Sequence, residues 1–339
     1  MIRFLLRSLL YLGVGCVILA LGALLCLYAG ADTWLVNRLA RTVVPGGVLH
    51  VGGVGGNYFT GIELRDATLN LTRSEGQLRV DTVRARYSLP TLLAGNLVLR
   101  RVQLIAPSVI LKQSVSGSWN PFPRRSHQPD PAKKKSSGSP ITVEHFSIVR
   151  GRAAIRHRTG QELPIRLLEA EGSLGKYALT VASLRLTTDS SGVSAHGSVP
   201  LPEAGSRLNL RHLDLSVDAR RLSLRDLSGF RSELDRDGSV AVNASARGQG
   251  SHAAVDAEVS FPDGGSVSLH GVLTPPKQSP VRYRADAEIR DFNPALLLTN
   301  RPLGERVNGR LAVDVAGESP SRLHGRVQLE VSDSRRWAS

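Results

Sequence analysis

The sequence predicts a mainly β protein in which an N-terminal transmembrane helix is followed by a long, curved, antiparallel β-sheet that forms a groove. Three observations lead to this prediction. The chain of 339 residues begins with an uncharged apolar stretch, and most of the remainder alternates apolar and polar residues with a period of two. Aromatic residues make up only 5%, so the apolar side chains are chiefly aliphatic. A period of two places apolar side chains on one face of a strand, and branched aliphatic residues favour strands.

Residues 1–31 are predicted to form a transmembrane signal anchor. The stretch 8–31 carries no charge, and a helix of that length rises about 36 Å, enough to cross a hydrocarbon core of about 30 Å. Arg3 and Arg7 precede it, so the positive-inside rule predicts a cytoplasmic N-terminus and a body on the other side of the membrane. The alternative is a cleaved signal peptide with its cleavage site near residues 29–31, but the apolar stretch exceeds the roughly 7–15 residues usual for such peptides.

Composition divides the rest of the chain into three regions. Residues 32–112 are predicted to form a short juxtamembrane helix and then strands. Residues 113–140 are rich in Pro, Ser and Lys and lack periodicity, which predicts a solvated linker. Residues 141–339 return to repetitive strands. The glycine-rich stretch 52–56 lacks the spacing of a phosphate-binding loop, and we interpret it as a turn between strands.

Six segments share a slip in the alternation. Two apolar residues stand at positions i and i+2, and two more stand at i+5 and i+7. Because side chains alternate between the faces of a strand, the odd spacing between the two pairs would place them on opposite faces. An extra residue has to be accommodated if both pairs are to face the same side. A β-bulge accommodates it and bends the strand, which predicts curved strands. Five of the segments supply the residues expected to line the groove: Ile62, Leu64, Leu69, Leu78, Val80, Val83, Leu97, Leu99, Val102, Leu104, Ile141, Val143, Phe146, Ile148, Leu179, Val181, Leu184 and Leu186. The sixth segment spans residues 208–215.

Later segments alternate without the slip, in residues 240–246, 255–261, 283–289 and 311–315. Two architectures fit such a long sheet with one apolar face. A sheet of many more than about ten strands usually curls or splits. Curling leaves an apolar trough, whereas splitting gives a sandwich whose faces meet in a dry core. Alternation alone does not choose between them.

The residue patterns argue against an enzyme, a metal protein and a nucleic-acid-binding protein. Both cysteines, Cys16 and Cys26, lie in the N-terminal apolar stretch, and no two of the nine histidines have metal-binding spacing. No nucleophile elbow occurs. The net charge is +14, but most basic residues are scattered singly, without aromatic residues that could stack on bases. We therefore expect no catalytic residues, no cofactor, no metal and no nucleic-acid partner.

Several local patterns resemble the AsmA-like superfamily of Gram-negative envelope proteins, and most closely the N-terminal part of TamB-type proteins. The patterns are an anchor followed by Trp34 to Arg41, the glycine-rich stretch leading into Gly61-Ile62-Glu63-Leu64-Arg65-Asp66, Val80 to Tyr87, Ser118-Trp119-Asn120-Pro121 before the linker, and Asp291-Phe292-Asn293-Pro294.

This resemblance implies a single-pass protein of the bacterial inner membrane with a periplasmic β-taco. Such a groove would shield phospholipid acyl chains and conduct them between the inner and outer membranes. The alternative is a TamB-type scaffold that assembles or translocates outer-membrane and autotransporter proteins with an outer-membrane barrel partner of the TamA type. TamB-type chains usually run longer and end in a further β-domain, so the resemblance also implies that region 141–339 is truncated at its C-terminus.

Overall fold

The computed structural model describes residues 47–57, 60–71, 76–88, 91, 98–112, 142–156, 160, 162–201, 210–228, 238–274, 281–293, 305–317 and 323–336. Within these ranges the protein is mainly β. The predicted anchor, the juxtamembrane helix and the linker 113–140 lie outside the described residues. The chain divides into unit 1, Met1–Lys176, and unit 2, Tyr177–Ser339.

No helix among the described residues has both the length and the apolar character needed to span a membrane.

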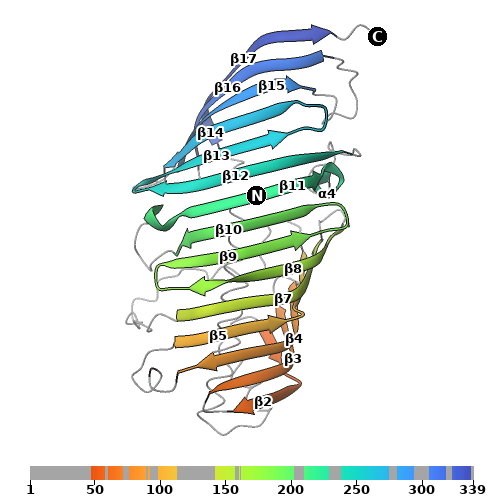
Figure 1. Ribbon diagram of the computed structural model, residues 1–339, viewed down its shortest axis with the longest axis vertical. Helices are drawn as coiled ribbons and strands as arrows, with labels where there is room; N and C mark the ends of the chain where they lie inside the picture. Colours follow the sequence, from red (N-terminus) through yellow and green to blue (C-terminus); the bar gives the residue numbers. More distant parts are fainter. Residues whose placement is uncertain are drawn as a thin grey trace. The chain divides into compact units, whose positions relative to one another are not determined.

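Unit 1 is a single sheet over its described residues (Figure 1). Its strands are β1 (Gly47–His50), β2 (Gly53–Asn57), β3 (Gly61–Leu71), β4 (Gly76–Tyr87), β5 (Val98–Ile105), β6 (Ser108–Lys112), β7 (Thr142–Arg156) and β8 (Glu162–Leu174). Both β1 and β2 pair with β3, while β5 and β6 both lie between β4 and β7. Each of these two pairs therefore acts as one interrupted strand.

The prediction of antiparallel pairing throughout is wrong at β7. This strand runs parallel to β5, with Leu99 opposite Val143, and parallel to β6, with Val109 opposite Ala153. A parallel pair needs a crossover connection of about a dozen or more residues. The predicted linker lies between β6 and β7 in the sequence, so it supplies the length of chain that parallel pairing requires.

The glycine-rich stretch is a strand and not the turn that we predicted. Residues 53–57 form β2 and pair with β3. The turn comes later, where the Thr60 N–H donates to the Asn57 carbonyl at 2.9 Å. Gly56 has φ 113°, and a Cβ there would lie 2.8 Å from the Gly61 carbonyl oxygen. Glycine at this position allows both the backbone conformation and the close approach of β3.

Three non-glycine residues of unit 1 adopt left-handed backbone conformations, and all three sit where strands break or slip. Asp66 in β3 has φ 52°, Ala106 between β5 and β6 has φ 51°, and Arg150 in β7 has φ 55°. The Ala106 N–H donates to the Val149 carbonyl at 2.8 Å, which places Ala106 beside Arg150. Because side chains rarely tolerate positive φ, each position marks a point where the strand changes direction.

Unit 2 is a nine-stranded antiparallel meander over its described residues. Its strands are β9 (Ala178–Thr187), β10 (Gly192–Pro200), β11 (Asp214–Ser223), β12 (Ser239–Gln249), β13 (His252–Ser260), β14 (Ser266–Thr274), β15 (Val281–Phe292), β16 (Glu305–Gly317) and β17 (Leu323–Arg336). Consecutive strands pair in the order of the sequence, so short connections are sufficient. Figure 1 shows the long strands β12 to β17 lying side by side.

The predicted slips are accommodated in two different ways. In β9, Val181 pairs with Gly197 and Leu184 pairs with Ala195, so two residues oppose one and form a β-bulge. Register shifts also mark the slips in β5 and β7. In β3 and β4 the register holds, because both strands slip at the same point. Asp66 then resets the alternation without a bulge, and both Leu64 and Ala67 are buried.

The prediction that residues 208–215 form a strand with the sixth slip is wrong. Residues Leu210–His212 form a 3-10 turn, η1, and β11 begins only at Asp214. The Leu213 N–H donates to the Leu210 carbonyl at 2.9 Å, which closes the turn. Leu208 lies outside the described residues. The spacing of the leucines resembles that of a strand, but in the structure Leu210 is buried from within a tight turn.

A small core closes one end of the strands in unit 2. Helix α4 (Leu224–Ser228) follows β11 and buries Leu224 against Val240 and Phe261. The rings of Phe261 and Phe292 are 4.9 Å apart between centroids. The Asp226 carboxylate of α4 accepts hydrogen bonds from Thr188 Oγ1 at 2.5 Å and from Ser190 Oγ at 3.0 Å, which fixes α4 to the β9–β10 turn.

The burial of single leucines predicts where stability resides. Leu99 in β5 is 0% exposed, so Leu99→Ala should lower the free energy of unfolding by about 2–5 kcal/mol. Leu329→Ala is the matched control, because Leu329 in β17 is 59% exposed and should lose less than about 0.5 kcal/mol. Urea unfolding measures both. Equal losses would contradict this distribution of the core.

Candidate functional site

The apolar side chains of unit 2 form three rows that cross its strands in register. The central row takes one residue from each strand: Leu184, Ala195, Val217, Ala244, Ala257, Leu269, Ala287, Leu311 and Leu329. A second row contains Val181, Gly197, Leu215, Ala246, Val255, Gly271, Ala285, Val313 and Val327. A third, from β11 to β17, contains Ala219, Val242, Val259, Val267, Ile289, Gly309 and Val331. We call the three rows the apolar face of unit 2.

The apolar face is long because the register is kept from strand to strand. Neighbouring strands lie about 4.8 Å apart, so nine strands give a continuous apolar surface about 38 Å long. Many of its residues are alanine or glycine, which contribute little volume. A face of such small side chains cannot fill a core by itself and needs other apolar groups against it.

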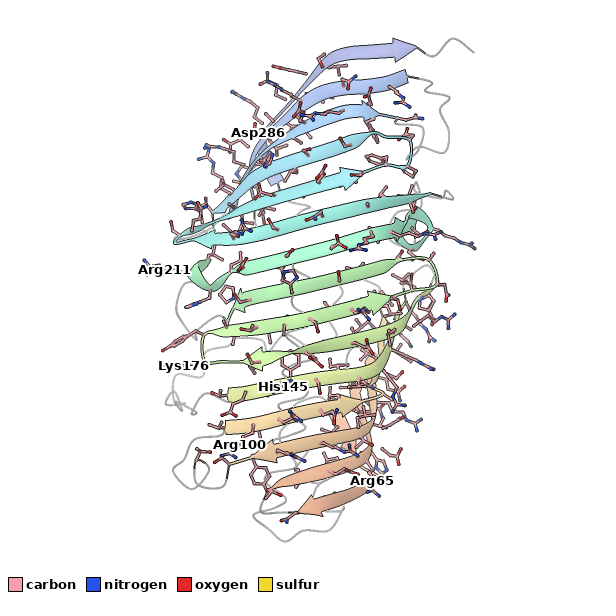
Figure 2. All side chains as sticks on the ribbon, in the orientation of Figure 1. Arg65, Arg100, His145, Lys176, Arg211 and Asp286 are labelled. Atoms are coloured by element: carbon pink, nitrogen blue, oxygen red, sulfur yellow. The ribbon has the colours of Figure 1, made fainter. Side chains whose placement is uncertain are left out.

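The opposite face of unit 2 is polar and carries ion pairs between strands. His270 Nδ1 lies 2.8 Å from Asp256 Oδ1 on the adjacent strand. Asp286, labelled in Figure 2, stands next to His270 in the register. Arg282 contacts the Asp314 carboxylate at 2.7 Å. One face is therefore apolar and the other solvated, as the alternation predicts.

Exposure of the apolar face is highest on β17. Most of its residues from β9 to β16 are half-buried. On β17 the exposed fractions are 61% for Val327, 59% for Leu329 and 56% for Val331. An exposed apolar surface on a protein marks a place where another molecule binds.

The predicted groove residues of unit 1 are buried more completely than the apolar face of unit 2. Leu64, Val83 and Leu104 stack across neighbouring strands and are each 1% exposed. Phe146 is half-buried. The other predicted residues of unit 1 that the structure describes are all buried: Ile62, Leu69, Leu78, Val80, Leu99, Val102, Val143 and Ile148. These side chains form a core in unit 1, and their contact with lipid stays a prediction.

The remaining predicted residues divide into two groups. Leu97 and Ile141 lie outside the described residues. Of the four predicted residues in β9, Leu179 and Val181 are buried, whereas Leu184 and Leu186 are half-buried. Val181 and Leu184 begin the second and central rows of the apolar face of unit 2.

Sequence reasoning did not nominate the part of the apolar face that lies on β12 to β17. The signal was present, because these strands alternate plainly and their pairing keeps apolar residues opposite one another. The predicted groove residues come from the segments with the slip, which lie in the first strands and are rich in leucine and valine. The alternation of these later segments is itself predicted, and their alanine-rich apolar positions are the feature that would have added them to the predicted groove residues.

The charged side chains of unit 2 form ion pairs on its polar face. Hydrogen bonds from Arg282 hold the pKa of Asp314 at about 2, below its usual value of 3.8. A hydrogen bond from Arg290 lowers the pKa of Glu288. Among the residues that the structure describes, no group of three or more His, Cys, Asp or Glu side chains is placed to hold a metal ion.

None of the family models, curated proteins or solved structures compared with this chain matches it.

The ion pair at Asp314 gives a titration that can be measured. The folded pKa is depressed, so the pair is intact above pH 3.8 and is lost as the pH falls toward 2. NMR titration of the Asp314 carboxyl should give a midpoint near pH 2. Arg282→Ala should move this midpoint upward by more than Arg284→Ala does, because Arg282 makes the dominant hydrogen bond. A larger shift from Arg284→Ala would contradict the assignment.

Proposed function

We propose that this chain is an envelope protein of the AsmA/TamB kind that shields the acyl chains of phospholipids on the apolar face of unit 2. The observation that carries the proposal is the register of the three apolar rows, two of which cross nine strands and one seven, on a face that is mostly half-buried. The patterns that resemble this superfamily support the same function. The proposed location is the bacterial inner membrane, with a single-pass anchor and the body in the periplasm.

The energetic reason for such a surface is the cost of hydrating hydrocarbon. Exposing ten methylene groups to water costs about 8 kcal/mol. An apolar surface about 38 Å long offers contact along the whole of an extended acyl chain. A chain moving along the rows would exchange one aliphatic contact for another of similar energy, so no step along the surface is strongly unfavourable.

The small residues of the apolar face suit this role better than a bulky core would. Ala244, Ala257 and Ala287 in the central row present apolar surface but occupy little space above the sheet. Glycine occupies position 271 in the second row and position 309 in the third row. An acyl chain lying on these residues would take the place of the side-chain volume that the sequence omits.

Unit 1 has a different role in this proposal. Its predicted groove residues are buried by the protein itself, so we assign them to a structural core. Leu99→Asp would bury an unpaired carboxylate there and disrupt folding. Substitutions in unit 1 therefore cannot distinguish lipid transport from stability, and the test belongs in unit 2.

Photo-crosslinking at adjacent positions tests the proposal. Leu311 and Ala312 are neighbours on β16, with Leu311 half-buried on the apolar face and Ala312 exposed on the polar face. A diazirine amino acid at position 311 should capture phospholipid in a Gram-negative host, and the same group at position 312 should not. Mass spectrometry of the adducts measures both.

The pair is a strict control because simple access to solvent predicts the reverse order. Position 312 is the more exposed of the two. Lipid adducts at 312 in equal or greater amount would sink the lipid function. A second matched pair is Ala257 and Glu258 on β13, of which only Ala257 lies in the central row.

The second candidate function is a TamB-type scaffold that offers a sheet edge to strands of outer-membrane or autotransporter proteins, together with a TamA-type barrel partner. It is favoured by one observation: among the described residues of unit 2, β17 pairs with β16 alone. An unpaired edge can accept an extended segment by β-augmentation. A photo-crosslinker at Gln328 on β17 should then capture an outer-membrane barrel protein. Adducts with lipid or with this chain alone would reject the scaffold.

A further inference from the structure

The edge strand β17 combines three features that point to a protein partner. Over the part of unit 2 that the structure describes, it is hydrogen-bonded on one side only, to β16. Its side chains from His324 to Ser332 are all exposed. Three of them, Val327, Leu329 and Val331, are apolar and lie on one face. Unprotected edges of this kind are templates for pairing with another strand.

The charges on the polar face of β17 indicate which strand it pairs with. Arg326, Gln328 and Glu330 alternate with the apolar residues. In the pairing with β16, Arg326 stands opposite Asp314 and Glu330 stands opposite Arg310. Arg326 and Glu330 are thus each opposite a residue of the other sign. Opposite charges across an antiparallel pair stabilise it, and like charges destabilise it.

The sequence of β17 offers the same complementarity to itself. Reading outward from Gln328, an apolar residue follows on each side, and then Arg326 on one side and Glu330 on the other. When this strand is rotated by two-fold symmetry about Gln328, Arg326 of each copy falls opposite Glu330 of the other. The second copy then presents to the free edge the order of charges that β16 presents to the paired edge.

We propose that β17 pairs antiparallel with β17 of a second copy of this chain, about a two-fold axis at Gln328. This arrangement is a symmetric interface in which each copy uses the same surface. On the apolar side, Val327 of one copy lies opposite Leu329 of the other, so the most exposed apolar residues of β17 are covered by their counterparts.

The charges also select the register. A two-fold axis at Leu329 would place Glu330 opposite Gln328 and Arg326 opposite Ser332, which leaves both charges without a partner of the other sign. The axis at Gln328 creates two opposite-charge pairs. Gln328 already donates to Glu330 Oε1 at 3.0 Å, which holds that carboxylate on the polar face.

The proposed dimer does not depend on the lipid function, but it affects that function's site. The second row ends at Val327 and the central row at Leu329, and both would continue into the partner's rows across the two-fold axis. The apolar faces of two copies of unit 2 would then form one surface.

A single cysteine placed on the axis tests the dimer directly. In the 339-residue chain with Cys16 and Cys26 replaced by serine, Gln328→Cys should form a disulfide-linked dimer on mild oxidation in the membrane, because the two residues are directly opposite. Ala312→Cys is the matched control. It lies beside Gln328 one strand inward, so its copies would be about 14 Å apart and should not be linked.

Charge reversal at two positions then tests the register. Arg326→Glu makes positions 326 and 330 both acidic, and Glu330→Arg makes both basic. Each variant alone should give about tenfold less cross-linked dimer through Gln328→Cys, because two favourable pairs become two like-charge pairs. Mixing the two variants in one membrane should restore the dimer as a heterodimer, since every cross-pair is again of opposite charge.

Mixing the two charge variants distinguishes a loss of pairing from a loss of folding. Each chain carries the same substitution whether it is tested alone or in the mixture, so a folding defect would persist in the mixture. Equal linking by Gln328→Cys and Ala312→Cys would overturn the proposal. So would charge variants that cross-link as well as the parent, or a mixture that stays as poor as its components. Absence of any linked dimer would overturn it as well.

Discussion

The structure depends on keeping apolar residues in phase from one strand to the next. A shift of one residue in a single pairing would move every apolar side chain of that strand to the solvated face. In unit 2 the pairing from β12 to β15 proceeds without a shift, and the alternation of each strand matches its neighbours. The apolar face and the polar face with its ion pairs both follow from this one constraint.

Unit 1 meets the same constraint with a different solution. Its strands break phase at the slips, and the phase is restored by β-bulges or by left-handed residues such as Asp66 and Arg150. Bulky leucines and valines on both sides of these points are buried to within a few per cent. Strands with small residues and constant phase instead leave a half-covered face. Side-chain volume therefore determines whether the apolar face of a unit is buried as a core or left half-exposed.

The sequence was sufficient to predict the β class, the apolar side of strands such as β3, β4 and β13, and the β-bulge beside Val181. It could not reveal the parallel pairing of β7, because a period of two is the same in parallel and antiparallel strands. The leucines at 210 and 213 matched a strand template although η1 is a turn. Alternation also shows which face is apolar but not what covers it, so Leu64 and Leu99 could not be assigned to a core in advance.

The parallel junction has a consequence for the order of folding. Leu99 and Val143 are 44 residues apart in sequence, whereas β7 and β8 are joined by a short connection. Closing a long loop is slow, so the β7–β8 hairpin should form first and dock onto β5 late. Once formed, the junction should tolerate variation in the length of the loop, since each doubling costs only about 0.6 kcal/mol. Evolution could lengthen or shorten this loop without disturbing the sheet on either side.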